Sequence, residues 1–183
     1  MKDCRIAIDV GHARGTGAAG NGQQEHTVCT RIARELQNCL QRMGMQADVI
    51  DFPDKTNAQD LEATIHAVNA GGYRVSVSLH CDCSDNEAAH GAHVCHRSLQ
   101  GYTLAAEIAD RLCPLLPGRA QRVVRRMDLA ILRRTVPVAV LVECGFISHA
   151  HDAAVQVRLP HLIALKIAEG VQSYVRNILK LAE

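Results

Sequence analysis

The chain has 183 residues, a formal net charge of +1 and an aromatic content of only 3%. This small net charge gives no general attraction to nucleic acid, and no segment reaches the roughly 20 apolar residues that a membrane span needs. A chain of this length is expected to form one domain, and its core must be built from Val, Ile, Leu and Ala.

Apolar runs and amphipathic repeats alternate along the first half of the chain. A short apolar run predicts a buried strand, and apolar residues four positions apart, as at Val28, Ile32 and Leu36, predict a helix. Gly44 ends that helix, and Asn57 can cap the next one. In chain order, the predicted elements are a strand at 4–10, a glycine-rich loop at 11–22, a helix at 24–42, a strand at 45–52, a helix at 57–70 and a strand at 74–80.

The second half continues the same alternation. In chain order, we predict a polar loop at 81–91, a short strand at 92–96, a helix at 99–112, a linker at 115–121, two short extended pieces within 122–134, a strand at 136–146 and a helix from about 159 to 181. Strands that alternate with helices of this length imply crossover connections and a mainly parallel sheet. The sequence therefore predicts an α/β fold in a single domain.

Four polar residues are candidates for chemistry. His12, His80 and Glu143 each follow an apolar run, and Glu25 lies at the start of the first helix. If the runs are neighbouring parallel strands, their carboxyl ends meet at one edge, where open α/β sheets bind ligands. Two imidazoles and a carboxylate are enough for a zinc site with an open position, and a further carboxylate can move protons. The pattern predicts a metal-dependent hydrolase.

Each of these residues also has a simpler interpretation. His12 could be a surface histidine in a loop, and Glu25 could interact only with the helix dipole. Glu143 directly follows an apolar run, where an unpaired carboxylate is costly, so a structural ion pair is its alternative. His80 ends a run whose residues face opposite sides of the sheet, so its side chain needs a partner.

Five segments carry a family resemblance when they are taken in order. They are IDVGH at 8–12, Glu25 at the first helix, VNAGGYRVSVSLH at 68–80, GAHV at 91–94 and LAILRRTVPVAVLVECGFISHAHD at 129–152. This ordered set resembles the zinc-dependent N-acetylmuramoyl-L-alanine amidases of the amidase-3 family, close to the catalytic domains of phage endolysins.

The resemblance implies a role for each candidate residue. His12, Glu25 and His80 would be the ligands of Zn²⁺, and Glu143 would be the catalytic acid/base. Residues 1–183 would form a zinc amidase catalytic domain with a twisted sheet of about six strands and helices on both faces. Its substrate would be the muramyl peptide of peptidoglycan, in which zinc-activated water cleaves the amide bond between N-acetylmuramic acid and L-alanine.

Two other function classes stay open from the sequence. One is a non-catalytic wall-binding module of the same fold, and the other is a zinc metallopeptidase that acts on a different amide. We expect a monomer that binds neither nucleic acid nor a membrane. The chain starts without a signal peptide, so we expect synthesis in the cytoplasm and action on the cell wall after release or delivery, as in phage lysis.

The chain departs from the family pattern at several positions. Ala13 and Arg14 follow His12 where the family often has two glycines. Asp82 replaces a usual Asn, which leaves the hydrogen bonds around the site open. His149 replaces an Asn in a way that could change only a helix cap, and Arg125-Arg126 replaces an Arg-Gly pair.

Three further groups of residues suggest chemistry. The eight cysteines are interpreted as buried thiols, and Cys81 and Cys83 point apart on extended backbone. We expect His90, His93 and His96 not to bind metal, and His93 to point into solvent or the rim of the cleft. The arginines could form a solvated edge or bind stem-peptide carboxylates; they are Arg122, Arg125, Arg126, Arg133 and Arg134.

Overall fold

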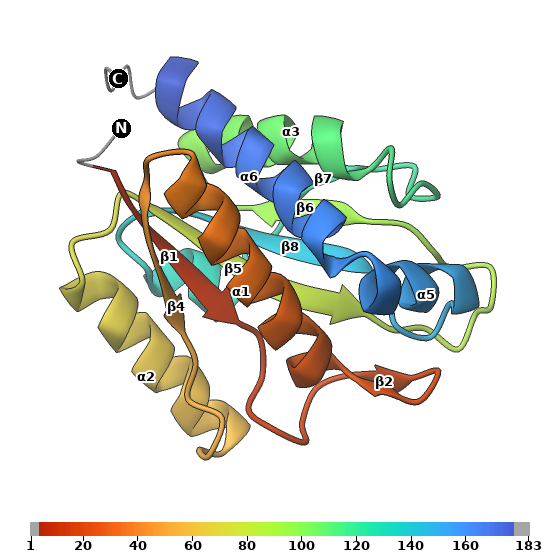
Figure 1. The fold of residues 1–183 in the computed structure, drawn as a ribbon. Helices are drawn as coiled ribbons and strands as arrows, with labels where there is room; N and C mark the ends of the chain where they lie inside the picture. Colours follow the sequence, from red (N-terminus) through yellow and green to blue (C-terminus); the bar gives the residue numbers. More distant parts are fainter. Residues whose placement is uncertain (1–3, 178–183) are drawn as a thin grey trace.

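The computed structural model describes residues 4–177, which form a mixed α/β structure around one six-stranded sheet (Figure 1). The strand order across the sheet is β4-β1-β5-β8-β6-β7. The strands of this sheet are β1 (Arg5–Val10), β4 (Gln46–Ile50), β5 (Val75–Asp82), β6 (His93–His96), β7 (Val123–Arg125) and β8 (Val138–Phe146). This architecture confirms the predicted α/β fold with a mainly parallel sheet of about six strands.

The sheet is parallel except at one pair of strands. β1, β4, β5 and β8 run in the same direction, whereas β6 is antiparallel to β8 and parallel to β7. The carboxyl ends of β1, β5 and β8 therefore meet at one edge of the sheet. That edge is where the predicted site residues lie.

Helices cover both faces of the sheet, as predicted (Figure 1). On one face, the long helix α6 packs against both α1 and α3, while α2 and α4 cover the other face. The helices are α1 (Glu25–Arg42), α2 (Asn57–Ala70), α3 (Leu99–Leu112), α4 (Ala130–Arg134), α5 (Ala150–Arg158) and α6 (Pro160–Asn177). No helix in the described part of the chain is long and apolar enough to cross a membrane.

The side chains of β8 point alternately into two different cores, and this alternation sets the face of the sheet on which Glu143 lies. Val140 and Val142 belong to the large core under α1, α3 and α6, whereas Leu141 belongs to the smaller core under α4. Successive strand residues face opposite sides of a sheet. Glu143 therefore lies on the same face as Leu141, three residues before the end of the strand.

The structure corrects four details of the sequence interpretation. Within 122–134, only the first piece is extended, as β7, and the second is the short helix α4. The glycine-rich loop contains a hairpin of β2 (Ala19–Gly20) and β3 (Gln23–Gln24), and α5 follows β8 without having been predicted. Thr56, not Asn57, caps α2, through a capping box with Gln59. The last predicted helix matches α6 to Asn177, and its predicted end at 178–181 lies outside the described residues.

Candidate functional site

Glu25 is held at the start of α1 by backbone amides. Ala18 donates its N–H to Oε2 at 2.6 Å, and Cys81 donates its N–H to Oε1 at 2.9 Å. The hairpin of β2 and β3 leads directly into the helix, and the Glu25 amide donates back to the Ala18 carbonyl. The residue is only 2% exposed. These contacts hold the carboxylate in one place, so the dipole-only interpretation of Glu25 is insufficient.

His12 stands in a strained backbone conformation beside Glu25. Its φ of 65° lies in the left-handed region, which costs a residue with a side chain about 1–2 kcal/mol. Its Nδ1 lies 3.1 Å from Asn57 Oδ1, and its Nε2 lies 3.4 Å from Glu25 Oε2. An amide oxygen only accepts hydrogen bonds, so Nδ1 carries the proton and Nε2 has its lone pair free. A histidine that ligates metal usually has such a partner on its other nitrogen.

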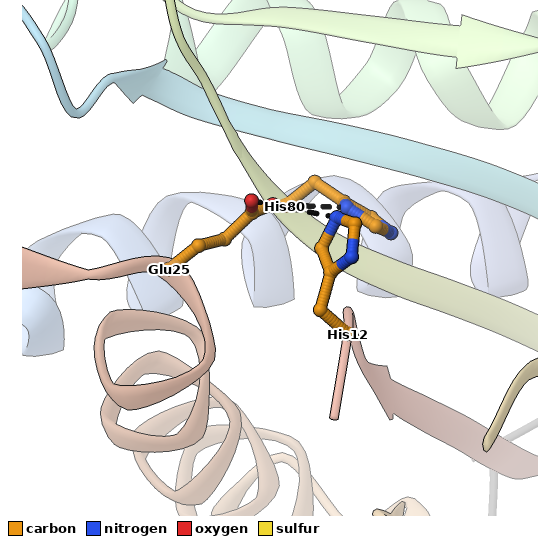
Figure 2. A group of neighbouring side chains, drawn as sticks. All are labelled: His12, Glu25 and His80. Carbon is orange, nitrogen blue, oxygen red and sulfur yellow. Dashed lines mark hydrogen bonds and ion pairs between the residues drawn. The ribbon is translucent and has the colours of Figure 1, made fainter. Parts of the chain in front are cut away.

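His80, near the end of β5, completes the cluster. Its Nδ1 lies 3.0 Å from Glu25 Oε1, and its ring meets that of His12 edge to face at 5.0 Å. One ligand atom from each of the three residues lies within 4.8 Å of the others. Figure 2 shows the three side chains converging from the end of β1, the start of α1 and β5. Two imidazoles and a carboxylate in this arrangement form a candidate metal site.

Two glycines allow the chain to approach this cluster closely. A Cβ atom at Gly17 would lie 2.6 Å from Glu25 Oε2, and one at Gly11 would lie 2.5 Å from the His80 ring. Gly17 also has a φ of 81°, which a side chain would disfavour. The backbone thus leaves room only for the ligand side chains, which fits a compact metal site.

The charges in the cluster suit a cation. Burial alone would raise the pKa of Glu25, but its hydrogen bond with His80 and its backbone donors lower it overall. Burial alone would lower the pKa of His80, but its hydrogen bond with Glu25 and the charge of Glu143 raise it overall. A carboxylate whose ionised form is favoured, beside two imidazoles, offers negative charge and lone pairs to a divalent cation.

Glu143 lies beside this cluster on the central strand. It is the register partner of His80 on β5 and of His93 on β6. Its Oε2 is buried without a hydrogen-bond partner among the described residues, and burial raises the pKa of Glu143 to about 7, against the opposing charge of His80. Within residues 4–177, no ion pair holds this carboxylate, which weakens its structural interpretation. A carboxyl group with a pKa near neutrality can both accept and donate a proton.

A pocket of about 180 Å³ lies next to the candidate metal ligands. It is bounded by the sheet on one side and by α2 and α4 on the other, and Asp60 and Thr64 of α2 line it. Asp60 Oδ1 and Thr64 Oγ1 are buried without a partner among the described residues, and burial raises the pKa of Asp60 to about 6. The pocket therefore offers polar groups beside the candidate metal site.

Comparison with known proteins identifies the family. A family model described as N-acetylmuramoyl-L-alanine amidase, Amidase_3, matches residues 6–173. The chain belongs to the Amidase_3 family. The resemblance inferred from the sequence motifs is thereby confirmed.

Solved structures of amidases share the fold of this Amidase_3 chain. The catalytic domain of the CD27L endolysin, which targets Clostridia Difficile, has 30% sequence identity and a TM-score of 0.85, with 92% of this chain and 96% of that domain covered. The amidase AmiC2 of Nostoc punctiforme has 23% identity and a TM-score of 0.84, with 96% and 98% covered. The second likeness supports the fold alone.

Two curated relatives are longer than this Amidase_3 chain. The N-acetylmuramoyl-L-alanine amidase LytC of Bacillus subtilis is 25% identical over an alignment of 181 positions, which covers 93% of this chain and 35% of LytC. The probable cell wall amidase LytH of Staphylococcus saprophyticus is 26% identical over an alignment of 184 positions, which covers 95% of this chain and 59% of LytH. The chain thus spans about a third of one relative and about three-fifths of the other.

Sequence reasoning missed two neighbours of the site. Asn57 was interpreted only as a helix cap, yet its side-chain oxygen accepts a hydrogen bond from His12 Nδ1. His93 was expected in solvent or at the rim of the cleft, but it is 5% exposed and its Nδ1 lies 3.9 Å from Asp82 Oδ2. The position of His93 within the strand AHVCH, paired to the strand that carries Glu143, is the signal that could have indicated its burial.

The cysteines and the arginine run are not among the ligands of the candidate metal site. Seven of the eight cysteines are buried and all are free, as predicted, and only Cys83 is exposed. The buried Cys81 faces Cys29, with 3.9 Å between the sulfur atoms, so Cys81 and Cys83 do not share a metal. In the arginine run, Arg126 pairs with Asp128 and Arg134 pairs with Glu62.

The burial of His93 predicts a loss of stability in acid. Burial, together with the positive charges of Arg119 and Arg126, lowers the pKa of His93 to about 4. The unfolded chain takes up this proton near pH 6.5, so the folded state loses up to about 3 kcal/mol as the pH falls from about 6.5 to about 4. We expect His93→Gln to remove this loss in denaturant unfolding of the metal-free protein.

The raised pKa values of Asp60 and Glu143 have the opposite effect on stability. As the pH falls, these groups take up protons in the folded state before they do so in the unfolded chain, which stabilises the fold. The relevant quantity is therefore the difference between the parent protein and the variant at each pH. His66→Gln, at an exposed position in α2, is the matched control. Parallel stability curves for the parent and His93→Gln between these pH values would contradict the prediction.

Proposed function

We propose that this chain is a zinc-dependent amidase that hydrolyses the bond between N-acetylmuramic acid and L-alanine in peptidoglycan. The observation that carries the proposal is the convergence of His12, Glu25 and His80 within 4.8 Å, with Glu143 as the register partner of His80. Membership of the Amidase_3 family supports it. Residues 1–183 would act as the catalytic domain.

Each protein group has a part in this reaction. His12, Glu25 and His80 would hold Zn²⁺ and leave a position open toward the substrate. A bound zinc ion would polarise the scissile carbonyl and lower the pKa of water toward neutrality. Asn57 would keep His12 in the tautomer with a free Nε2, and the amides of Ala18 and Cys81 would keep Glu25 oriented.

Glu143 would perform the proton transfers. Its carboxylate would accept a proton from the attacking water as the new carbon–oxygen bond forms. It would then donate that proton to the alanine nitrogen as the amide bond breaks. The buried, unpartnered Oε2 and the raised pKa of Glu143 support both steps, because the two protonation states are close in energy near neutral pH.

The site of action belongs to the same proposal. Peptidoglycan lies in the cell wall, so we place the activity there, with a monomeric protein acting on muramyl peptides. The 30% identity to the CD27L endolysin catalytic domain supports a role in phage lysis.

Identification of the bond cleaved in purified peptidoglycan tests the proposal. We expect the zinc-loaded protein to release intact stem peptides with new L-alanine amino termini, detected by mass and amino-terminal analysis, and the chelator-stripped protein to release none. Zinc added back to the stripped protein should restore release. Cleavage inside the stem peptide would indicate a metallopeptidase, and binding without any release would indicate a wall-binding module.

A further inference from the structure

A second group of metal-ligand side chains lies outside the candidate active site. His90 stands in the loop after β5, His149 directly precedes α5, and Asp152 lies in the first turn of that helix. One nitrogen from each imidazole and one carboxylate oxygen lie within 4.8 Å of one another. We propose that His90, His149 and Asp152 form a second zinc site in this protein.

Asp152 has one oxygen used by the fold and one that faces the histidines. Its Oδ2 accepts the backbone N–H groups of Gly91 at 2.7 Å and Phe146 at 3.0 Å. Its Oδ1 lies 3.3 Å from His149 Nδ1, and the side chain is only 1% exposed. The structural role of Asp152 is fulfilled by Oδ2 alone. The buried negative charge also offsets the positive helix terminus, which would otherwise disfavour a cation.

His90 is held in the tautomer that can bind metal. Its Nδ1 lies 2.9 Å from the Pro117 carbonyl oxygen, which can only accept a hydrogen bond, so Nδ1 carries the proton. The lone pair of Nε2 is then free, with the backbone partner that metal-binding histidines commonly have. A Cβ atom at Gly118 would collide with the His90 ring. The glycine thus lets the backbone of the 115–121 segment lie against the imidazole.

The two imidazoles are arranged together beside the carboxylate. The rings of His90 and His149 stack with centroids 4.8 Å apart and an interplanar angle of 22°. Stacked neutral rings attract, and the neutral imidazole is the form that binds metal. His151 Nδ1 lies 3.7 Å from Asp152 Oδ1, so a further nitrogen donor is close.

The donor set favours zinc over calcium or magnesium, because imidazole nitrogen suits zinc and all-oxygen sites suit the harder ions. Tetrahedral zinc with ligand bonds of about 2.1 Å places its ligand atoms about 3.4 Å apart, so small side-chain rotations would close the cluster. Such a site would join the loop that carries His90 to α5, next to the end of β8. The sequence-based expectation that His90 does not bind metal is replaced by this proposal.

Zinc stoichiometry tests the proposal without an activity assay. The purified chain is stripped with a chelator, and Zn²⁺ alone is titrated by calorimetry near neutral pH. We expect two equivalents for the parent, one for His149→Ala, one for His80→Ala and none for the double variant. His90→Gln, which keeps a polar side chain, should also bind one equivalent. Unfolding of each metal-free variant shows whether it folds.

The variants separate the two sites. His66→Ala, at an exposed position away from both clusters, should keep two equivalents. A single equivalent in the parent that His80→Ala abolishes and His149→Ala leaves intact would overturn the second site. A single equivalent that His149→Ala abolishes would instead leave the second site standing and contradict zinc at His12, Glu25 and His80. Zinc that raises the thermal midpoint of His80→Ala would support the second site independently.

Discussion

Glu143→Gln is expected to lower turnover on peptidoglycan by roughly 100- to 10,000-fold, the usual contribution of a general acid/base. The glutamine keeps the size and shape of the side chain but cannot accept and return a proton. Because Glu143 is not among the three converging ligands, zinc content should stay at the parent level. Clearing of a cell-wall suspension measures the rate, and metal analysis of the same sample measures zinc.

The control for this substitution is Glu107→Gln, a partly exposed carboxylate on α3 that pairs with Arg111. It should keep the parent rate, because it lies on a helix that carries none of the site residues. A Glu143→Gln protein that clears the suspension at the parent rate would remove Glu143 from the mechanism. Loss of both zinc and activity in that variant would instead indicate that Glu143 supports the metal site.

His80→Ala should remove the zinc ion proposed at His12, Glu25 and His80, and activity with it. Loss of a partner that only orients a ligand typically costs 10- to 100-fold in metal affinity, so loss of a ligand should cost more than about 100-fold. The substitution also removes the imidazole that hydrogen-bonds Glu25 Oε1. Competition against a chelator, followed by metal analysis of the protein fraction, measures the affinity.

The comparison for His80→Ala is His66→Ala, which removes an exposed imidazole from α2. That protein should bind zinc and clear cell wall as the parent does. A His80→Ala protein with full zinc occupancy and parent affinity would refute the proposed ligand set. If the His80→Ala protein keeps zinc only at the second site, it should still bind one equivalent.

The candidate site could be predicted from the sequence because three of its residues lie at or near the carboxyl ends of strands. His12, His80 and Glu143 follow apolar runs, and the carboxyl ends of parallel strands meet at one edge. Local sequence thus determines both the strand and the place where its polar residue lies. Local sequence was not enough to place Glu25, because the position of its carboxylate depends on the amides of Ala18 and of Cys81, which is 56 residues away.

Residues whose role depends on distant partners were missed or placed wrongly. His93 lies on a strand that pairs with β8, and this pairing buries it beside Asp82. His90 and Asp152 are 62 positions apart in sequence, and no local pattern indicates that a loop and the start of α5 meet. The second extended piece within 122–134 is the helix α4, because the cluster of Ile131, Leu132 and Leu141 packs it against the sheet.

The sequence alone determined the order of the six strands of the large sheet and of the four longest helices, the parallel arrangement of most strands and the residues near their carboxyl ends. These follow from periodicity and from the positions of polar residues after apolar runs, which are local properties of the chain. Only the tertiary structure decided which nitrogen of His12 is free, that Glu143 Oε2 is buried with no partner in the described part of the chain, and that two histidines and an aspartate meet beside α5. These depend on contacts between segments far apart in sequence, because the pKa of a group and its available lone pairs are set by its neighbours in space.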